Sequence, residues 1–407
     1  MNTVNKYTFN GNSVAEQMVS VMINTISECI SNCIPENDLK ALVLLGGYGK
    51  GEGGITNKDG LFKPHNNFDL LLVTPSRRKF NSINISNKIS EKVRSLSQIL
   101  GIGIDISVIS EGKLRAMPTR VLWYDMKEGH KTIHGDKELI PSLNHISKNI
   151  PAWDMRNLMV NRGSLLLINR LCLQHRNLTS DIKKIIIKHT MKAIIGYGDA
   201  LIFSLGEYHW SYSEKKKRIL INDQVSFQFK RLYQEAINFR FNPSYGHYLQ
   251  IDLQKWQDET CLLLKKVHLQ CESVRLDSPN LTWGNYLETS LSHLINDVIE
   301  NPKSLIKGLL NICKTQKTMP PKGFNRLSKL GCLTSNHETI LPLLHPLITF
   351  DLSEVIHKGQ YNNFIASYLN IKYEKKSDFI CPYLKLWGDH FDPNFRSVLE
   401  KNNIKLS

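Results

Sequence analysis

The sequence predicts an α/β (α+β) domain followed by a mainly α-helical domain, and three observations support this prediction. Three short apolar runs have the length and composition of buried strands: ALVLLG (41–46), NFDLLLVT (67–74) and GIDISVIS (103–110). An amphipathic helix is predicted at 83–100, between the second run and the third. From Trp153 to about Asn301 the apolar residues recur mainly with helical spacing.

These signals divide the chain into four parts. Residues 1–37 contain a predicted helix that packs on the α/β domain; Asn12, Ser13 and Glu16 resemble a capping box at its start, and Pro35 ends it. Residues 38–150 form the α/β domain, and 151–301 form the helical domain, with a boundary at Glu300-Asn301-Pro302. Residues 302–407 are predicted to be a weakly defined helical extension.

Composition excludes several classes of protein. There is no apolar run of about 18 residues that would predict a membrane-spanning helix, and residues 1–13 lack the apolar core of a signal peptide. The eight cysteines are scattered and show no zinc-site spacing, so we expect reduced thiols and a cytoplasmic protein. The formal charge of +15 favours an anionic partner, such as a nucleotide, a nucleic acid or an acidic surface.

The segment LLGGYGKGEGG (44–54) is a candidate phosphate-binding turn. Gly46 and Gly47 follow a predicted strand and are expected to open a helix, where backbone N–H groups and the helix dipole favour phosphate. Tyr48, Lys50 and Glu52 lie in the same turn, and we include them in the candidate site. The structural alternative is a tight strand-to-helix turn that binds no ligand.

Two acidic residues lie in the next two predicted strands. Asp69 and Asp105 are each flanked by apolar residues, where a carboxylate is costly unless it binds a metal or hydrogen-bond donors. A glycine turn followed by strand carboxylates is the arrangement that nucleotidyl transfer with two metal ions requires. The sequence therefore predicts a site for Mg²⁺ or Mn²⁺ beside a nucleoside triphosphate.

These pieces resemble the motif of the polymerase-β-like nucleotidyltransferase superfamily: Leu45-Gly46-Gly47, then Asn67-Phe68-Asp69, then Asp105. GGYGKGEGG is similar to the Arg-Gly-Glu version of the glycine motif in many bacterial members, with Lys50 in the place of Arg. MKEGHKTIHGDKELI (126–140) resembles the segment that often closes such domains, where a strand pair ends in a Gly-Asp turn. The resemblance covers about residues 38–150 and implies a domain with a mixed sheet, followed by a helical substrate-binding domain.

The sequence departs from this family at two places. An insertion, ITNKDGLFKPH (55–65), is expected to loop out near the site. Asn67 stands where the family has the first carboxylate of a pair, and it brings no charge to a metal. Three interpretations stay open: a degenerate member that binds nucleotide without turnover, an active enzyme in which Glu52 or another acid substitutes, or an Asp→Asn change introduced to trap substrate.

The helical domain adds candidates of its own. Lys192 and Asp199 lie on one side of a predicted helix, together with Lys188. By the resemblance, such a domain contributes basic residues to the triphosphate and an acid that acts as base on the acceptor, so Lys192 and Asp199 are the candidates. Tyr208 and Tyr212 are candidates for stacking on a base. The alternative is a solvated helix face with two packed tyrosines.

Together, these observations predict a nucleotidyltransferase that moves a nucleoside monophosphate from a triphosphate, ATP by default, to an acceptor hydroxyl and releases pyrophosphate. The acceptor is open among RNA, a protein and a small molecule, and neither DNA nor a membrane is expected as a partner. One alternative is a non-catalytic nucleotide- or RNA-binding protein on the same fold, which Asn67 and the charge of +15 motivate. A third is a helical interaction protein with an α/β scaffold.

Overall fold

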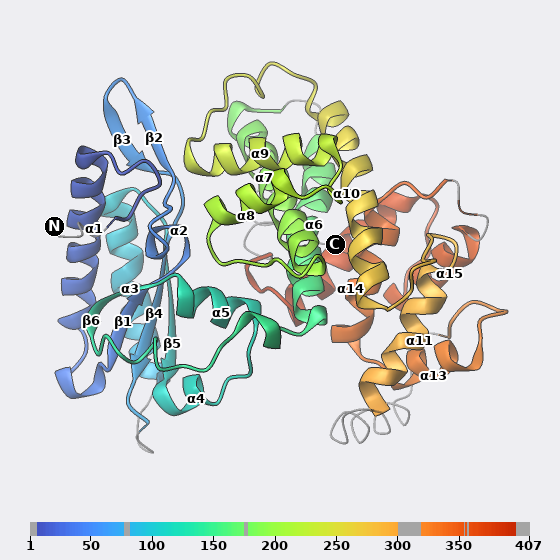
Figure 1. Cartoon of the computed structure of the whole chain (residues 1–407), viewed down its shortest axis with the longest axis horizontal. Coiled ribbons are helices and arrows are strands. Elements are labelled where there is room, and N and C mark those ends of the chain that lie inside the picture. The colour runs from blue at the N-terminus through green and yellow to red at the C-terminus, as the bar shows by residue number, and fades with distance from the viewer. Residues whose placement is uncertain are drawn as a thin grey trace. The chain divides into compact units, whose positions relative to one another are not determined.

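A computed structural model describes residues 6–76, 82–174, 178–299, 319–353, 355 and 358–395 (Figure 1). The chain forms two compact units, and each unit combines segments that are distant in sequence. The first is Met1–Asp154 with Glu207–Ser244, and the second is Met155–Gly206 with Tyr245–Ser407. The expected boundary at 300–302 lies outside the described residues, and the four-part division of the chain stays a prediction.

The first unit contains a four-stranded mixed sheet in the order β5-β4-β1-β6. The strands are β1 (Ala41–Leu44), β4 (Phe68–Thr74), β5 (Ile104–Ser110) and β6 (Lys131–Gly135). β1 runs antiparallel to both of its neighbours, whereas β4 and β5 are parallel. The three predicted strands are confirmed, as is a mixed α/β architecture with many helices. The segment 126–140 contributes a helix end and one strand, β6, rather than a strand pair.

Alternate side chains of β4 enter two different cores. One face of the sheet packs against α1 (Ser13–Ser31) and α3 (Ser82–Leu100), as Figure 1 shows, and it receives Phe68, Leu70 and Leu72. The other face receives Leu71 and Val73, which pack with Leu114 of α4 (Glu111–Arg115) and Met126 of α5 (Val121–Glu128). Asp69 lies on this second face, because side chains two residues apart in a strand point the same way.

The insertion after the glycine segment is a β-hairpin rather than an irregular loop. β2 (Ile55–Lys58) pairs antiparallel with β3 (Leu61–Pro64). Asp59 and Gly60 join the strands with φ values of 53° and 82°, and Asp-Gly is a dipeptide that favours such left-handed two-residue turns. Gly60 N also donates to Asn57 Oδ1 at 3.1 Å.

Two helices of the predicted helical region belong to the first unit instead. α8 (Tyr212–Ile221) and α9 (Phe227–Phe241) lie within Glu207–Ser244, the segment that joins the α/β part. Phe241 stacks on Phe9 with ring centroids 3.8 Å apart, and Asn242 accepts a hydrogen bond from Asn10 at 2.7 Å. The end of α9 is therefore tied to the N-terminal segment.

The second unit is helical throughout its described parts. Its helices are α6 (Ala152–Leu173, which begins at the end of the first unit), α7 (Ser180–Ser204), α10 (Leu253–Arg275), α11 (Tyr286–Ile299), α13 (Arg326–Thr334), α14 (His337–Thr349), α15 (Lys358–Leu369), η3 (Lys376–Phe379) and α16 (Ile380–His390). None of the helices in the described ranges combines the length and apolar character that crossing a membrane requires.

Two histidines lie in the core of the second unit. His268 and His345 are fully buried, and their rings stack with centroids 6.1 Å apart. His268 pairs through Nδ1 with the hydroxyl of Tyr197 at 3.3 Å, and His345 pairs through Nε2 with Thr349 at 3.0 Å. Burial lowers the pKa of His268 to about 4 and holds the pKa of His345 well below its ordinary value.

This core should make the second unit sensitive to acid. The two histidines are neutral when folded, whereas histidine in an unfolded chain titrates near a pKa of about 6.5, so the unfolded state binds more protons as the pH falls below that value. We expect the free energy of unfolding to be level above about pH 7 and to fall between about pH 6.5 and 4, by about 3 kcal/mol for His268 alone.

Hydrogen exchange in α10 and α14 as a function of pH measures this loss. His268→Gln should flatten the dependence, whereas His247→Gln, at an exposed position of the same unit, should leave it unchanged. An identical pH dependence in the parent and in His268→Gln would contradict the assignment.

Candidate functional site

Three polar side chains lie together at the end of one sheet face. Asp69 of β4 and Asp105 of β5 are register partners across the parallel strand pair, and Asn67 precedes β4 on the same side. Asn67 Nδ2 donates to Asp105 Oδ2 at 2.9 Å. The structure thus brings together the three residues that the sequence singles out as metal ligands, although their role stays a prediction.

The Asn67 amide is accommodated by a glycine at the start of the neighbouring strand. A Cβ atom on Gly103 would lie 2.5 Å from Asn67 Oδ1, closer than real contacts allow. Gly103 also accepts a hydrogen bond from the N–H of Phe68 at 2.9 Å. A side chain at position 103 would therefore displace the amide from Asp105.

The Gly46-Gly47 turn lies directly beside Asp69. Gly46 has a φ of +63° and begins α2 (Gly46–Gly49), a single helical turn, so the predicted strand-to-helix turn is confirmed. A Cβ atom on Gly46 would lie 2.2 Å from Asp69 Oδ2. Glycine is required at position 46 both by the left-handed backbone and by the nearby carboxylate of Asp69.

The other glycines of the segment have structural reasons that involve no ligand. At each of these positions, the Cβ atom of any other residue would lie too close to another part of the same unit. The nearest groups are the carbonyl of Leu44 for Gly49 (2.4 Å), the carbonyl of Lys6 for Gly51 (2.8 Å), the ring of Tyr48 for Gly53 (2.1 Å) and the carbonyl of Arg240 for Gly54 (2.2 Å). For these positions the close partner is the protein's own backbone and one buried ring.

Tyr48 is a buried anchor of the turn. Its hydroxyl donates to Gly54 O at 2.8 Å and accepts from His65 N at 3.1 Å, and its ring makes an edge contact with Phe68. Burial raises the pKa of Tyr48, so the phenol stays protonated. These contacts explain the position of Tyr48 structurally; a contact with nucleotide stays a prediction.

Glu52 caps a helix. Its carboxylate accepts from Ser211 Oγ at 2.7 Å, Tyr212 N at 2.8 Å and Ser213 N at 3.1 Å, which satisfies the start of α8. Glu52 is 8% exposed, and although burial alone would raise its pKa, these hydrogen bonds hold the pKa below its ordinary value. With both oxygens engaged in this way, Glu52 is a poor substitute for the missing metal-binding carboxylate.

Lys50 is also paired within the unit. Its ammonium group donates to Asp125 at 2.6 Å and to the carbonyl of Trp210 at 2.8 Å, and its side chain is 5% exposed. Tyr208 donates to the other oxygen of Asp125 at 3.0 Å and accepts from the buried Lys215 at 3.2 Å. Lys50 and Tyr208 thus form a polar network that joins the glycine segment to the α8 region.

Arg240 is a basic residue at the turn that the sequence does not single out. A Cβ atom on Gly47 would lie 3.2 Å from Arg240 Nη2, and the guanidinium stacks on the ring of Tyr212 at 3.9 Å from its centroid. The buried Nε has no hydrogen-bond partner within the described ranges. Because Arg240 lies 193 residues after Gly47, only the return of α9 to this unit could have revealed it.

Tyr212 is surrounded by cations. Besides Arg240, the ammonium groups of Lys50 and Lys215 lie 4.7 and 5.0 Å from its ring centroid. Such cation–π contacts orient positive groups and offset part of their desolvation. The structure therefore gives Tyr212 a contact role toward cations, while stacking on a base stays a prediction.

Lys192 and Asp199 belong to the second unit. Both lie on α7, where Asp199 is 6% exposed and Lys192 is half-buried. Their predicted placement on one helix is confirmed. The predicted roles, toward a triphosphate and an acceptor, stay predictions, because these residues and the glycine turn lie in different units.

The chemistry of the sheet face fits a hard divalent ion. Asp69, Asp105 and Asn67 offer carboxylate and amide oxygens, the ligands that Mg²⁺ prefers. The described residues contain no group of three or more His, Cys, Asp or Glu side chains placed to hold a metal. The set on this face has two acids, and its third member is an amide.

Comparisons with known proteins add no family assignment. No protein-family model matches the chain, and no curated protein is detectably similar to it.

Replacing Glu52 tests its structural role. Glu52→Gln should lower the free energy of unfolding of the first unit by about 1–3 kcal/mol. The amide replaces one of the two accepting oxygens by an NH₂ group, which cannot accept the hydrogen bonds that this oxygen receives in the parent. The loss should be largest at neutral pH and should shrink as the pH falls below the ordinary carboxyl range, where Glu52 of the parent becomes protonated and loses its charge advantage over the amide.

Denaturant unfolding measures this difference, with the exposed Glu235→Gln on α9 as a matched control. If Glu52→Gln is as stable as the parent but loses Mg²⁺-dependent binding, Glu52 is a ligand and the capping role is wrong.

Proposed function

We propose that this chain binds a nucleoside triphosphate with Mg²⁺ at the Gly46-Gly47 turn and transfers the nucleoside monophosphate to an acceptor hydroxyl, releasing pyrophosphate. The observation that carries the proposal is the register pairing of Asp69 with Asp105, directly beside that turn. ATP is the default donor. The acceptor is an RNA, a protein or a small molecule.

The strand arrangement supports this function. β1, the glycine turn, β4 with Asp69 and the parallel strand β5 with Asp105 occur in this order along the chain, and the β2–β3 hairpin lies between the turn and β4. The resemblance to polymerase-β-like nucleotidyltransferases rests on the same order of motifs. Independent of the resemblance, carboxylates on a partly exposed face beside a glycine turn suit a ligand that combines a cation with phosphate groups.

Each group has a definite task in this proposal. The backbone of Gly46 and Gly47 would receive phosphate oxygens, with no side chain in the way. Arg240 would donate to the phosphates from the side of α9, held in orientation by Tyr212. Asp69 and Asp105 would be the ligands of Mg²⁺, with Asn67 as a neutral oxygen donor. When bound, Mg²⁺ supplies charge neutralisation and lowers the pKa of the acceptor hydroxyl.

A catalytically degenerate nucleotide- or RNA-binding protein is the second candidate. The hydrogen bond from Asn67 to Asp105 favours this candidate, because Asn67 Nδ2 donates to a carboxylate oxygen that would otherwise be available as a metal ligand. A site with one carboxylate fewer neutralises less of the charge on two divalent ions. Binding of triphosphate with slow or absent transfer is the behaviour that this candidate predicts.

Isothermal titration with each of the four triphosphates, with and without Mg²⁺, separates both candidates from a helical scaffold protein. Incorporation of labelled nucleotide into cell lysate then separates the enzyme from the binding protein. Absence of triphosphate binding under both conditions would refute the proposed function in either form.

Changing Asn67 to Asp tests the missing carboxylate. In Asn67→Asp, a second negative charge faces Asp105 at hydrogen-bond distance, so the protein without metal should be less stable than the parent. Mg²⁺ should then raise its melting temperature by a few degrees, more than for the parent. Nucleotide transfer should rise by orders of magnitude, because a charged metal ligand is worth several kcal/mol in the transition state.

Melting curves with and without Mg²⁺, together with labelled-nucleotide incorporation, are the measurements. Asn67→Ala, which removes the hydrogen bond without adding charge, is the control. Equal transfer by the parent and by Asn67→Asp would mean that another acid completes the site.

Removing Arg240 tests the phosphate contact. Arg240→Ala should weaken triphosphate binding by about 10- to 100-fold, since one or two charge-assisted hydrogen bonds are lost. Arg240→Lys should recover part of the affinity. Titration calorimetry measures the effect, and Arg231→Ala, at an exposed position of the same helix, should bind like the parent. Unchanged affinity in Arg240→Ala would remove this residue from the site.

A further inference from the structure

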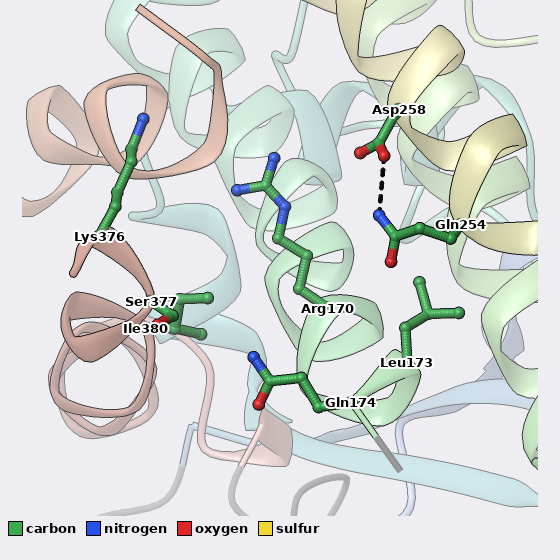
Figure 2. Close-up of a pocket in the computed structure, with 8 residues that line it drawn as sticks. All are labelled: Arg170, Leu173, Gln174, Gln254, Asp258, Lys376, Ser377 and Ile380. Atoms are coloured by element: carbon green, nitrogen blue, oxygen red, sulfur yellow. Dashed lines mark hydrogen bonds between the residues drawn. The ribbon is translucent and has the colours of Figure 1, made fainter. Parts of the chain in front are cut away.

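A pocket in the second unit is lined partly by charged groups that the protein itself engages (Figure 2). Asp258 accepts a hydrogen bond from Gln254 at 2.8 Å, and Lys376 donates to the carbonyl of Phe350. A ligand in this pocket would have to compete with both contacts. The thiols on the surface of the first unit offer a group of ligands that are arranged differently.

The cysteines in the described ranges differ in their exposure. Four are buried, namely Cys172, Cys261, Cys271 and Cys332. Three are partly exposed, namely Cys29 and Cys33 in the first unit and Cys381 in the second. Of these three, Cys29 and Cys33 are only four residues apart, so they are the candidates for binding one ligand together.

Cys29 and Cys33 lie one helical turn apart at the end of α1. Cys29 belongs to the last turn of the helix, and the C-cap residue Asn32 keeps helical backbone angles, with φ −69° and ψ −15°. The N–H of Cys33 donates to the carbonyl of Ile30 at 3.0 Å, which continues the turn. Side chains at positions i and i+4 of a helix are neighbours, with Cβ atoms about 5–6 Å apart. The two thiols therefore lie on the same side of the helix.

Cys29 interacts both with Cys33 and with a lysine of the neighbouring helix. Burial raises the pKa of the Cys29 thiol, Cys33 raises it further through its charge and a hydrogen bond, and the ammonium group of Lys92 lowers it. Lys92 is exposed on α3, which packs on the same face of the sheet as α1 (Figure 1). Both cysteines also pack against the apolar core under these helices. The thiol pair is thus supported by the core and still accessible to solvent.

The spacing of the two cysteines suits a bridging metal ion better than a disulfide. A disulfide requires Cβ atoms about 3.5–4.5 Å apart, which is closer than successive turns of a helix bring them. With metal–sulfur bonds of about 2.3 Å, an ion between two sulfur atoms holds them about 4.6 Å apart. The i, i+4 spacing allows that separation without a change in the backbone.

Two thiolates favour a soft ion that needs few ligands. The described residues contain no group of three or more His, Cys, Asp or Glu side chains placed to hold a metal, so the four ligands of a structural zinc site are not present in these ranges. Thiolate ligands select Cu⁺ among the first-row metal ions, and Cu⁺ is stable with two sulfur ligands in line. Binding releases the proton of each thiol. The complex then carries one negative charge, and the ammonium group of Lys92 beside Cys29 offsets it.

We propose that Cys29 and Cys33 form a binding site for a soft monovalent metal ion of the Cu⁺ class, held by two thiolates at the end of α1. The site uses none of the residues assigned to the triphosphate or to Mg²⁺. The proposal is therefore independent of the function proposed above.

Anaerobic titration of the full chain with Cu⁺, in competition with a coloured Cu⁺ chelator, tests the proposal. Cys29→Ser and Cys33→Ser should each weaken binding about 100-fold or more, because each removes one of the two metal–sulfur bonds. X-ray absorption of the parent with one equivalent of Cu⁺ should show two sulfur ligands. This measurement needs no variant, so it decides the outcome if a serine variant folds poorly.

Two further variants locate the ion. Cys381→Ser, which removes the partly exposed thiol of the second unit, should bind Cu⁺ like the parent. Lys92→Gln should weaken binding by a smaller factor than either serine variant in the pair, because it removes charge but no ligand. The proposal is overturned if Cys29→Ser and Cys33→Ser bind Cu⁺ as tightly as the parent, if Cys381→Ser alone loses the ion, or if the absorption spectrum shows nitrogen or oxygen ligands.

Discussion

Close backbone contact around the glycine segment is the constraint on which the first unit depends. The carbonyl groups of Lys6, Leu44 and Arg240 lie so close to glycines of this segment that they leave no room for a Cβ atom. The same segment contains the Tyr48 ring, which fills the space beside Gly53. Because the N-terminal segment, β1 and α9 all converge here, the Gly46-Gly47 turn has a fixed position in front of Asp69.

The N-terminal segment is itself held by a buried acid. Glu16 accepts hydrogen bonds from Tyr7 N at 2.6 Å and from Thr8 N at 2.8 Å, rather than closing a capping box with Asn12. Asn12 caps α1 alone, accepting from the N–H groups of Val14 and Ala15. Glu16 thus connects the first helix of the chain to the strand bridge between Thr8 and Gly53.

Charge around the turn is distributed unevenly. Lys50 is neutralised by Asp125, and the Glu52 carboxylate is satisfied by the start of α8. Arg240, in contrast, stacks on the ring of Tyr212, and its buried Nε has no hydrogen-bond partner in the described part of the chain. Asp105 accepts a hydrogen bond from the amide of Asn67, which stands where the family motif has a second carboxylate. The turn therefore has a basic residue beside Gly47, and the sheet face beside it has two acids and one amide.

The sequence by itself determined the local elements: β1, β4, β5, α3 and the Gly46-Gly47 turn. Strand periodicity and the backbone freedom of glycine depend on a few neighbouring residues, so both can be recognised from the sequence without the tertiary structure. The Asp59-Gly60 dipeptide also favours a hairpin turn, although we expected only a loop at this place. The tertiary structure decided that α8 and α9 join the first unit, that Glu52 and Lys50 are engaged within it, and that Arg240 reaches Gly47. Those pairings join residues far apart in the chain, and they depend on which surfaces are buried together, which no local pattern specifies.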